Sequence, residues 1–318
     1  MRALVTGAAG FVGANLVRRL LADGHDVHVV LRPDSDPWRL RDIWPRLLPV
    51  HGDLTDASST HAALAEAEPE WVFHLAAHGA YPTQRDHSQI LQTNVQGTAH
   101  LLLAARAAGA RAFVHAGSSS EYGLKDHAPN ESEALDPNST YAVAKAAATL
   151  LCRQFARETS LPTVTLRLYS VFGPFEEPSR LMPTLATHLM RGVLPPLTTP
   201  NTARDFVYVD DVTDAFIRAA ERADATGAIF NIGSGRQTSL ATLVQQVRHE
   251  FEIVDEPRWA TMASRSWDTT SWIADPRLAR ERLGWCAQTE LIDGLRALVG
   301  WLRTRSGEAA ARYGLSAT

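Results

Sequence analysis

The stretch "LVTGAAGFVGANLV", residues 4–17, decides the expected fold. A short apolar run ends in glycine, and two further glycines follow at intervals of three before a helical segment. Glycines at this spacing let a strand turn tightly into a helix and leave room for a pyrophosphate at the helix N-terminus. The strand–turn–helix context favours a dinucleotide site over a plain tight turn. The residues expected to contact a dinucleotide here are Gly7, Gly10, Phe11, Val12 and Gly13.

Outward from this turn, strand-like and helix-like segments alternate along the first half of the chain. The strand-like runs are residues 2–7, 26–32, 47–54, 71–77, 111–119 and 162–173. Helical patterns separate them, which predicts parallel pairing with helices on both faces. The fold class is therefore α/β, a doubly wound parallel sheet. Two later runs, residues 206–211 and 228–235, are expected to return to the same sheet as strands.

A change of composition after Gly173 predicts a domain boundary. The following segment is irregular and rich in proline, in contrast to the regular alternation before it. We expect a dinucleotide-binding domain of residues 1–173 plus 206–233. A smaller C-terminal substrate lobe would comprise residues 174–205 plus 234–318.

Bulk composition excludes several classes of function. The 318-residue chain is 45% hydrophobic with a net charge of −4, and it has no long basic run, so a nucleic-acid partner is not expected. No apolar stretch approaches the roughly 20 residues that a membrane helix needs. Two cysteines and a glycine-rich turn close to the N-terminus favour a cytoplasmic protein without disulfides. His74 and His78 are four apart in a strand-like run, where they lie well separated, so no metal site is expected.

Further short motifs follow in order along almost the whole chain. They are "GDL" (52–54), "HLAA" (74–77), "TNVQGT" (93–98), "GSSSEYG" (117–123), "RLYSVFGP" (167–174), "RDFVYVDDV" (204–212) and "NIGSG" (231–235). With the glycine turn and Tyr141-x-x-x-Lys145, this set resembles the extended short-chain dehydrogenase/reductase family, which includes nucleotide-sugar epimerases, dehydratases and 4-ketoreductases. The resemblance runs from Leu4 to about Trp301. It implies a Rossmann domain with a bound nicotinamide cofactor and a C-terminal lobe that holds a nucleoside diphosphate sugar.

The resemblance assigns catalysis to Ser118, Tyr141 and Lys145. In the family the tyrosine is the proton shuttle, the lysine lies beside it, and a serine or threonine contacts the reacting oxygen. Residues four apart share one helix face, and a free tyrosine, with a pKa of about 10, is a poor base at neutral pH. A nearby ammonium and the positive nicotinamide ring would stabilise its phenolate. Ser119 is the alternative serine if the loop is shifted by one position.

Cofactor contacts are expected at the ends of several strands and on the helix that carries Tyr141. Asp53, at the end of the third strand, is placed to meet an adenine; it is otherwise a helix cap. Arg32, at the end of the second strand, favours the 2′-phosphate of NADP(H) over NAD, unless it is a solvated surface arginine. The further cofactor candidates are Leu54, Ala76, Ala77, Asn94, Tyr141 and Lys145.

Substrate contacts are expected on both sides of the predicted domain boundary. Arg204 matches the family arginine that reaches the diphosphate, with an ion pair to Asp205 or Asp210 as the alternative. Ser170 stands where family members commonly carry asparagine. The substrate candidates are His78, Tyr81, Ser119, Ser170, Arg204 and Arg265, with a structural role for His78 equally open. Four tryptophans are expected in the core of the lobe: Trp259, Trp267, Trp272 and Trp285.

The residues after Ser118 discriminate between possible reactions. Family dehydratases carry an acid soon after the catalytic serine or threonine, where this chain has Ser119 and Ser120, with Glu121 one position later. The sequence therefore favours a 4-ketoreductase that uses NADPH, with a 4-epimerase as the alternative, a 4,6-dehydratase less favoured and a non-catalytic cofactor sensor as the reading outside enzymology. The apolar surface of the helix at 94–108 and of the helix after Tyr141 predicts a homodimer through a four-helix bundle.

Overall fold

A seven-stranded parallel sheet forms the centre of the computed structural model, which describes residues 1–81, 83–262 and 269–315. The strand order is β10-β6-β5-β4-β1-β2-β3, so the chain reverses direction across the sheet beside β1. Central strands such as β4 are apolar and almost wholly buried, as sheets covered on both faces require. These observations confirm the doubly wound α/β prediction. The strands are β1 (Arg2–Thr6), β2 (Asp26–Leu31), β3 (Leu48–His51), β4 (Trp71–His74), β5 (Ala112–Ser118), β6 (Thr163–Leu168) and β10 (Ala228–Ile232).

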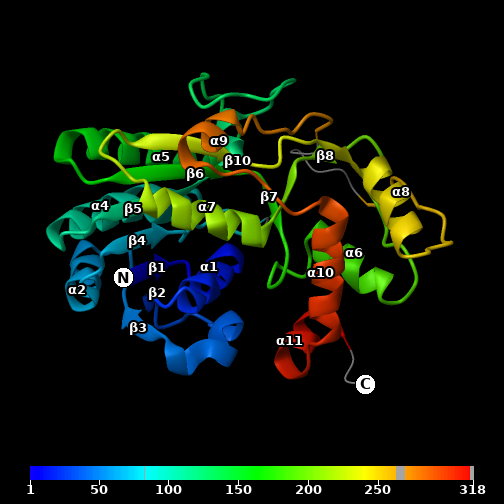
Figure 1. Cartoon of the computed structure of the whole chain (residues 1–318), viewed down its shortest axis with the longest axis horizontal. Coiled ribbons are helices and arrows are strands. Elements are labelled where there is room, and N and C mark those ends of the chain that lie inside the picture. The colour runs from blue at the N-terminus through cyan, green and yellow to red at the C-terminus, as the bar shows by residue number, and fades with distance from the viewer. Residues whose placement is uncertain (82, 263–268, 316–318) are drawn as a thin grey trace.

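Helices cover both faces of the sheet (Figure 1). Two of them, α1 (Phe11–Ala22) and α7 (Val209–Glu221), pack together on one face, and α9 (Arg277–Leu283) joins α7. The other face carries α2 (Ala57–Ala67), α4 (Gly97–Ala107) and α5 (Thr140–Thr159). A buried apolar cluster lies under each layer and fixes the helices to the sheet.

A third apolar cluster holds the lobe together. It contains residues of α6 (Leu181–Leu189), α8 (Leu240–Glu250) and α10 (Leu291–Arg303), together with Tyr313, which follows α11 (Gly307–Arg312). Trp38, from the 3₁₀ helix η1 (Trp38–Arg46), packs into the same cluster and edge-on against Tyr313. The lobe therefore rests on an early part of the chain as well as on late ones, and the exact domain division stays a prediction.

Two strand predictions are corrected. The run at 206–211 does not return to the main sheet: β9 (Phe206–Tyr208) pairs with β7 (Ser170–Phe172) in a separate two-stranded sheet, and α7 begins directly after it. The expected strand at 162–173 is two strands, because the chain breaks at Tyr169 between β6 and β7. A second small sheet joins β8 (Ala203–Arg204) to β11 (Thr238–Ser239). These short strands lie where the lobe faces the carboxyl ends of the main strands.

The segment expected as one helix at 94–109 is more elaborate. A short helix α3 (His87–Leu91) and a π turn η2 (Gln92–Gln96) lead into α4. After β5, the 3₁₀ turn η3 (Ser119–Tyr122) begins a long connection that reaches α5. A π turn changes the direction of the side chains along a helix, and such turns often lie at functional sites.

Candidate active site

A cavity of about 1210 Å³ lies between the carboxyl ends of the central strands and the lobe. Open α/β sheets bind ligands at this edge, where the strand order reverses. Of the sequence candidates, Asn94 is outside the wall of the cavity and Arg265 is outside the described residues. The predicted residues in the wall are Gly7, Gly10, Phe11, Val12, Gly13, Arg32, Asp53, Leu54, Ala76, Ala77, His78, Tyr81, Ser118, Ser119, Tyr141, Lys145, Ser170 and Arg204.

The glycine-rich turn at one end of the cavity requires its glycines. Gly7 has a φ of +69°, and a Cβ there would lie 2.6 Å from the amide nitrogen of Ala76. A Cβ on Gly13 would lie 2.2 Å from the carbonyl oxygen of Gly7, so the helix could not approach the strand as closely. Gly10 is the N-cap of α1 and has no side chain to cover the first amides of the helix. This cradle fits the pyrophosphate of a dinucleotide.

Two further cofactor candidates, Asp53 and Arg32, have polar contacts of their own. Asp53 accepts hydrogen bonds from the amide and the hydroxyl of Thr55 at 2.9 and 2.8 Å. The N-cap of α2 is Asp56, so Asp53 is not the helix cap that was the alternative. The side chain of Arg32 is 49% exposed and lies 3.3 Å from the carboxylate of Asp34.

Asn94 supports the cavity from behind. It is buried in η2, where its side-chain oxygen accepts from the amide of His78 at 2.8 Å and its side-chain nitrogen donates to the carbonyl of His78 at 2.7 Å. The amide group therefore fixes the main chain at His78. Asn94 is not among the residues of the cavity wall, and its direct contact with the cofactor stays a prediction.

The three catalytic candidates converge at the centre of the cavity. Ser118 is the last residue of β5, and Tyr141 and Lys145 lie on the first turns of α5, which Ser139 caps. Burial raises the pKa of Tyr141 to about 12, and a hydrogen bond with Ser118 opposes that rise. Burial lowers the pKa of Lys145 to about 8, and its Nζ donates to the carbonyl of Ala116 at 2.7 Å.

Glu121 points away from the cavity. Its carboxylate is fully buried, pairs with the Nε of Arg167 at 2.8 Å and accepts from Thr149 at 3.0 Å. It also accepts from the amide of Ser118 at 2.8 Å, which completes a capping box around η3. Ser119 and Ser120 line the cavity instead. The two positions after Ser118 therefore present hydroxyl groups to a bound molecule.

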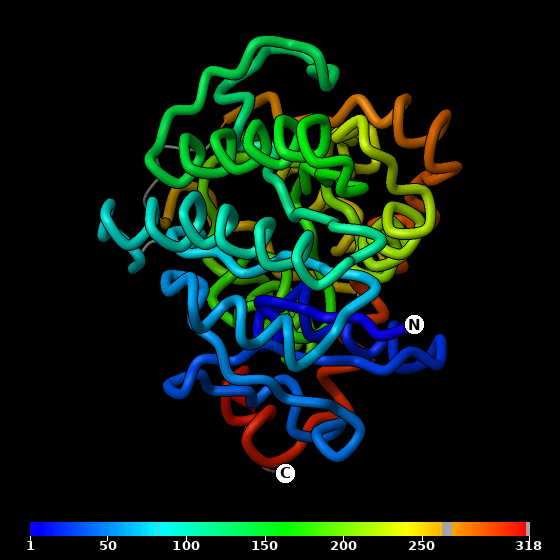
Figure 2. Tube along the Cα trace, turned by 90° about the vertical axis from the view of Figure 1, so that its left-hand side faces the viewer, coloured from blue at the N-terminus to red at the C-terminus, as the bar shows by residue number. Residues whose placement is uncertain are grey.

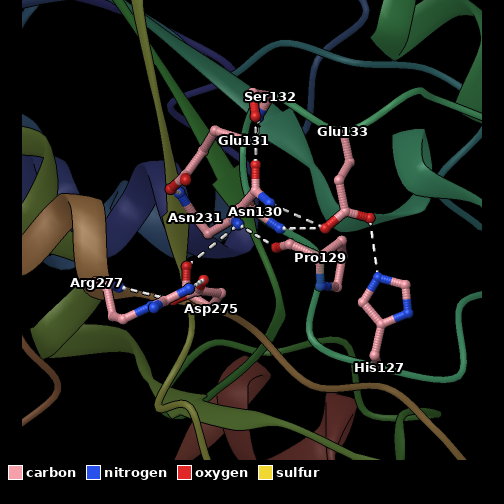
Figure 3. A network of polar contacts seen from close by, with 9 residues as sticks. All are labelled: His127, Pro129, Asn130, Glu131, Ser132, Glu133, Asn231, Asp275 and Arg277. Carbon is pink, nitrogen blue, oxygen red and sulfur yellow. Dashed lines mark hydrogen bonds and ion pairs between the residues drawn. The ribbon is translucent and has the colours of Figure 1, made fainter.

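The buried pair continues into a wider polar network. Arg167 donates to the hydroxyl of Tyr122 at 2.7 Å, and that hydroxyl donates to Asn231 on β10 at 2.9 Å. Asn231 in turn holds the connection after η3, because its amide groups bind Glu131 and the carbonyl of Pro129 (Figure 3). The network ties the turn that carries Ser118 to the edge strand β10.

Arg204 lies on β8 beside Trp272, with its guanidinium carbon 5.6 Å from the centre of the indole ring. The alternative partner Asp205 is fully buried, and its carboxylate accepts four hydrogen bonds, two from Ser234 and one each from the amides of Gly235 and Ala274. Both Arg204 and Trp272 line the cavity.

Two of the four tryptophans depart from the expected lobe core. Trp272 lines the cavity, and Trp285 is buried in the cluster under α1 and α7, where its Nε1 donates to the carbonyl of Asp211 at 2.7 Å. Trp259 packs against the lobe cluster as expected. Trp267 lies outside the described residues.

Sequence reasoning missed four charged residues in the wall: Arg85, Glu176, Glu177 and Arg180. Arg180 donates to the carbonyl of Ala80 at 3.0 Å and lies over the ring of Tyr81 at 5.5 Å. Burial raises the pKa of Glu176 to about 8, and the charge of Arg180 opposes that rise. The sequence feature that could have pointed to Glu176 and Arg180 is the charged run "FEEPSR", residues 175–180, which follows the start of the proline-rich segment.

Residues 1–81, 83–262 and 269–315 contain neither a metal-binding cluster nor a membrane-spanning helix. Within those ranges, no group of three or more His, Cys, Asp or Glu side chains could hold a metal ion. His74 bonds through its two ring nitrogens to Thr6 at 2.8 Å and Thr98 at 2.9 Å. Among the helices of this part of the chain, none is both long and apolar enough to cross a membrane.

Comparison with known proteins identifies the family of the chain. The model of the NAD dependent epimerase/dehydratase family matches residues 3–233. The chain is 36% identical to a UDP-glucose 4-epimerase of Mycolicibacterium smegmatis, over 96% of this chain and 100% of the relative. It is 32% identical to a dTDP-glucose 4,6-dehydratase of Streptomyces griseus, over 94% of this chain and 93% of the relative.

A solved structure gives the same result for the fold. The crystal structure of a UDP-glucuronic acid 4-epimerase from Bacillus cereus, in complex with UDP-glucuronic acid and NAD, superposes with a TM-score of 0.82. It is 26% identical and covers 95% of this chain and 99% of its own. The chain therefore belongs to the NAD dependent epimerase/dehydratase family, the nucleotide-sugar-modifying enzymes of the extended short-chain dehydrogenase/reductase type.

Proposed function

We propose that this enzyme oxidises and re-reduces C4 of a nucleoside diphosphate sugar, with 4-epimerisation as the net reaction. The observation that carries the proposal is the convergence of Ser118, Tyr141 and Lys145 in one cavity with the glycine cradle. A bound nicotinamide would supply hydride exchange. The cavity, at about 1210 Å³, is above the usual range of roughly 300–1,000 Å³ for a single small-molecule site, which suits two nucleotides.

The chain's own residues would then move and hold one proton. Tyr141 accepts the proton of the C4 hydroxyl during oxidation and returns it during reduction. Ser118 donates to the same oxygen and keeps it near the phenol. Lys145 is still mostly protonated at neutral pH, since its pKa is lowered only to about 8, so its ammonium can stabilise the phenolate.

Diphosphate recognition is assigned to the lobe side of the cavity. Arg204 offers a planar guanidinium, whose fork of donors matches the oxygens of a phosphate. Trp272 lies beside it in the wall. The position of both residues on the lobe supports a site for the nucleotide half of the substrate there.

Dehydration is disfavoured by the direction of Glu121. An acid is needed near the sugar to remove water, but Ser119 and Ser120 occupy the two wall positions after Ser118. Glu121 is committed to Arg167 and to the amide of Ser118. The chain is therefore similar to a dehydratase, but at this turn it has no acidic side chain that faces the cavity.

A 4-ketoreductase that uses NADPH is the second candidate, and Arg32 is the observation that favours it. The sequence alone ranks it first. Two findings change our order: Asp34 lies 3.3 Å from the guanidinium, in the place where a 2′-phosphate would have to compete, and the relatives include epimerases, one of them with NAD bound. NAD is thus the proposed cofactor and NADP the alternative.

The test is to incubate the purified enzyme with UDP-glucose and, separately, with dTDP-glucose, and to follow the sugars by NMR. Conversion to the 4-epimer with NAD in trace amount supports epimerisation. Stoichiometric NADPH oxidation by a 4-keto-6-deoxyhexose nucleotide, without epimer interconversion, makes the ketoreductase the lead. Formation of a 4-keto-6-deoxy product from dTDP-glucose contradicts our interpretation of Glu121. Native mass spectrometry of the protein identifies the cofactor that it carries.

A further inference from the structure

Glu176 is a carboxyl group built into the wall of the cavity without an evident structural task. Its residue is 7% exposed, yet it lines the cavity. Within the described part of the chain, its buried Oε2 has no hydrogen-bond partner. An unpaired polar atom that is buried costs about 1–3 kcal/mol. Because Glu176 lines the cavity despite this cost, its carboxyl group is a candidate for contact with the substrate.

Glu176 lies at the end of the cavity that holds the reacting groups. The positive charge of Arg180 lowers the pKa of the carboxyl group of Glu176. It also lowers the pKa of the phenol of Tyr141. The same guanidinium lies over Tyr81. Arg180 thus links Glu176 with Tyr81 and Tyr141, and we infer that the sugar, which must reach Tyr141, lies beside these residues.

The charges around Glu176 are balanced when its carboxyl is ionised. Glu177 pairs with Arg39 of η1 at 3.4 Å, and Arg180 opposes Glu176. The remaining neighbours are neutral donors: the amide of Gly173 binds the carboxyl, and the hydroxyl of Tyr313 donates to the main-chain oxygen of Glu176 at 2.6 Å. A further carboxylate in this place would be an uncompensated buried charge.

We propose that Glu176 is a sugar-binding residue that selects an uncharged hexosyl group and rejects a uronosyl group. A sugar hydroxyl can donate to Oε2 of the ionised acid or accept from the protonated acid, so it satisfies Glu176 in either state. A sugar carboxylate offers only acceptor oxygens and requires Glu176 to hold a proton. The proposal rests on the proposed function, because it names the sugar class that this cavity takes.

Proton linkage makes the selection depend on pH. The pKa of Glu176 is raised to about 8, and a uronate that binds only the protonated form loses affinity by up to about tenfold per pH unit above that value. A hexose that donates to the ionised form does not suffer this loss. The ratio of the two affinities cancels effects that act on both sugars alike, such as titration of Lys145.

The experiment measures the dissociation constants of UDP-glucose, UDP-glucuronic acid and UDP by calorimetry between pH 6.5 and 9.5, with turnover measured in parallel. We expect wild-type enzyme to prefer UDP-glucose, with the preference widening roughly fivefold from pH 8 to pH 9. Glu176→Gln keeps a donor and an acceptor and cannot ionise, so its preference should be smaller and independent of pH. Glu177→Gln removes the charge of the next residue in the same cavity wall, whose carboxylate is already paired with Arg39, and should keep the widening.

The outcomes separate the two proposals. A preference for UDP-glucuronic acid, or a ratio that is unchanged in Glu176→Gln, overturns the role of Glu176 alone. Equal loss of the pH effect in Glu177→Gln assigns it to general charge and also overturns that role. Binding of both sugar nucleotides no better than UDP overturns the sugar site and the proposed function together. The wild-type pH series stands by itself if Glu176→Gln does not fold.

Discussion

At the scale of single residues, burial favours the neutral phenol of Tyr141, and a neutral phenol cannot accept a proton from the substrate. Burial raises the pKa of the phenol of Tyr141 to about 12. The ammonium group of Lys145 donates a hydrogen bond to the carbonyl of Ala116. Positive charge that arrives with an oxidised nicotinamide would favour the phenolate. The same burial that disfavours ionisation in the free enzyme would strengthen that effect, since charges act over longer range in a low dielectric.

The first prediction concerns Tyr141→Phe. The substitution removes one hydroxyl and leaves the ring, so the melting temperature and the affinity for cofactor should stay close to wild type. General acid–base catalysis is worth about 10²–10⁴-fold, and kcat should fall by that factor. Steady-state kinetics on the confirmed sugar nucleotide measure it. A variant within about threefold of wild type would show that another group moves the proton.

The second prediction concerns Arg32→Asp. A charged hydrogen bond contributes about 1.5–3 kcal/mol, so affinity for NADPH should fall roughly 10–100-fold, while affinity for NADH is kept or improved. Fluorescence titration of both cofactors measures the change. Arg111→Asp is the matched control, because Arg111 is an exposed arginine paired with Glu70 outside the cavity. An Arg32→Asp variant with unchanged affinity for NADPH would show that Arg32 does not contact the 2′-phosphate.

At the scale of elements, the turn from β5 into η3 is held from two directions. Ser118 caps η3 with its own hydroxyl, and Glu121 returns a bond to the amide of Ser118 from inside the core. Glu121 is anchored by Arg167 on β6, the neighbouring strand. Ser118, the serine proposed for catalysis, is thus positioned by an ion pair that does not line the cavity.

The third prediction concerns Glu121→Gln, which keeps the shape and removes the charge opposite Arg167. Loss of one partner from a buried pair costs about 3–5 kcal/mol, so the denaturation midpoint should fall clearly. Denaturant titration measures the loss of stability. Arg236→Gln breaks an exposed pair with Glu290 and should cost less than about 1 kcal/mol.

A double variant isolates the pair itself. Glu121→Gln combined with Arg167→Met leaves no unpaired charge and should recover part of the lost stability, which a double-mutant cycle quantifies. A loss below about 1 kcal/mol in Glu121→Gln alone would mean that the pair does not hold the turn.

At the scale of the whole molecule, α4 and α5 lie side by side on one face, as Figure 2 shows in cyan and green. Their outer surfaces carry large apolar side chains: Leu103 is 56% exposed, Val143 45% and Leu150 46%. Two copies of this helix pair would make a four-helix bundle, with the apolar residues between them. The homodimer expected from the sequence is thus a proposal with a defined surface.

The fourth prediction concerns that surface. Leu103→Glu together with Leu150→Glu should convert a dimer to a monomer, because two like charges from each copy would meet at the interface. Light scattering at micromolar concentration measures the mass. Leu48→Glu is the matched control, since Leu48 is 45% exposed on the edge strand β3, away from α4 and α5. A monomeric wild-type protein contradicts the proposal directly.

The parts of the fold that the sequence predicts are those specified locally. The glycine turn lies within seven residues, and Tyr141 and Lys145 share one helix face by their spacing alone. Position in the cavity is harder to predict where packing between distant segments decides it. Glu176 and Arg180 reach the wall because the irregular segment after β7 folds back over Tyr81 and below Tyr313.

Two more cases show the same limit. Asn94 lies on a π turn, a feature that the residue pattern does not predict. Its side chain accepts a hydrogen bond from the main chain of His78 and is not in the cavity wall. The strand pattern of residues 206–208 is real, but its partner is the short strand β7, and only the break at Tyr169 makes that partner available. The local sequence pattern determines whether a segment forms a helix or a strand. Contacts between distant segments determine which strand it pairs with.

The buried network behind Ser118 also has a consequence for the evolution of the chain. Its members Glu121, Tyr122, Arg167 and Asn231 come from three separate stretches of sequence, yet each satisfies another's polar group. A single replacement would strand a partner at a cost comparable to much of the 5–15 kcal/mol that keeps a domain folded. Descendants of this chain should therefore change these positions in concert, leaving a covariation signature in sequences that diverge from it.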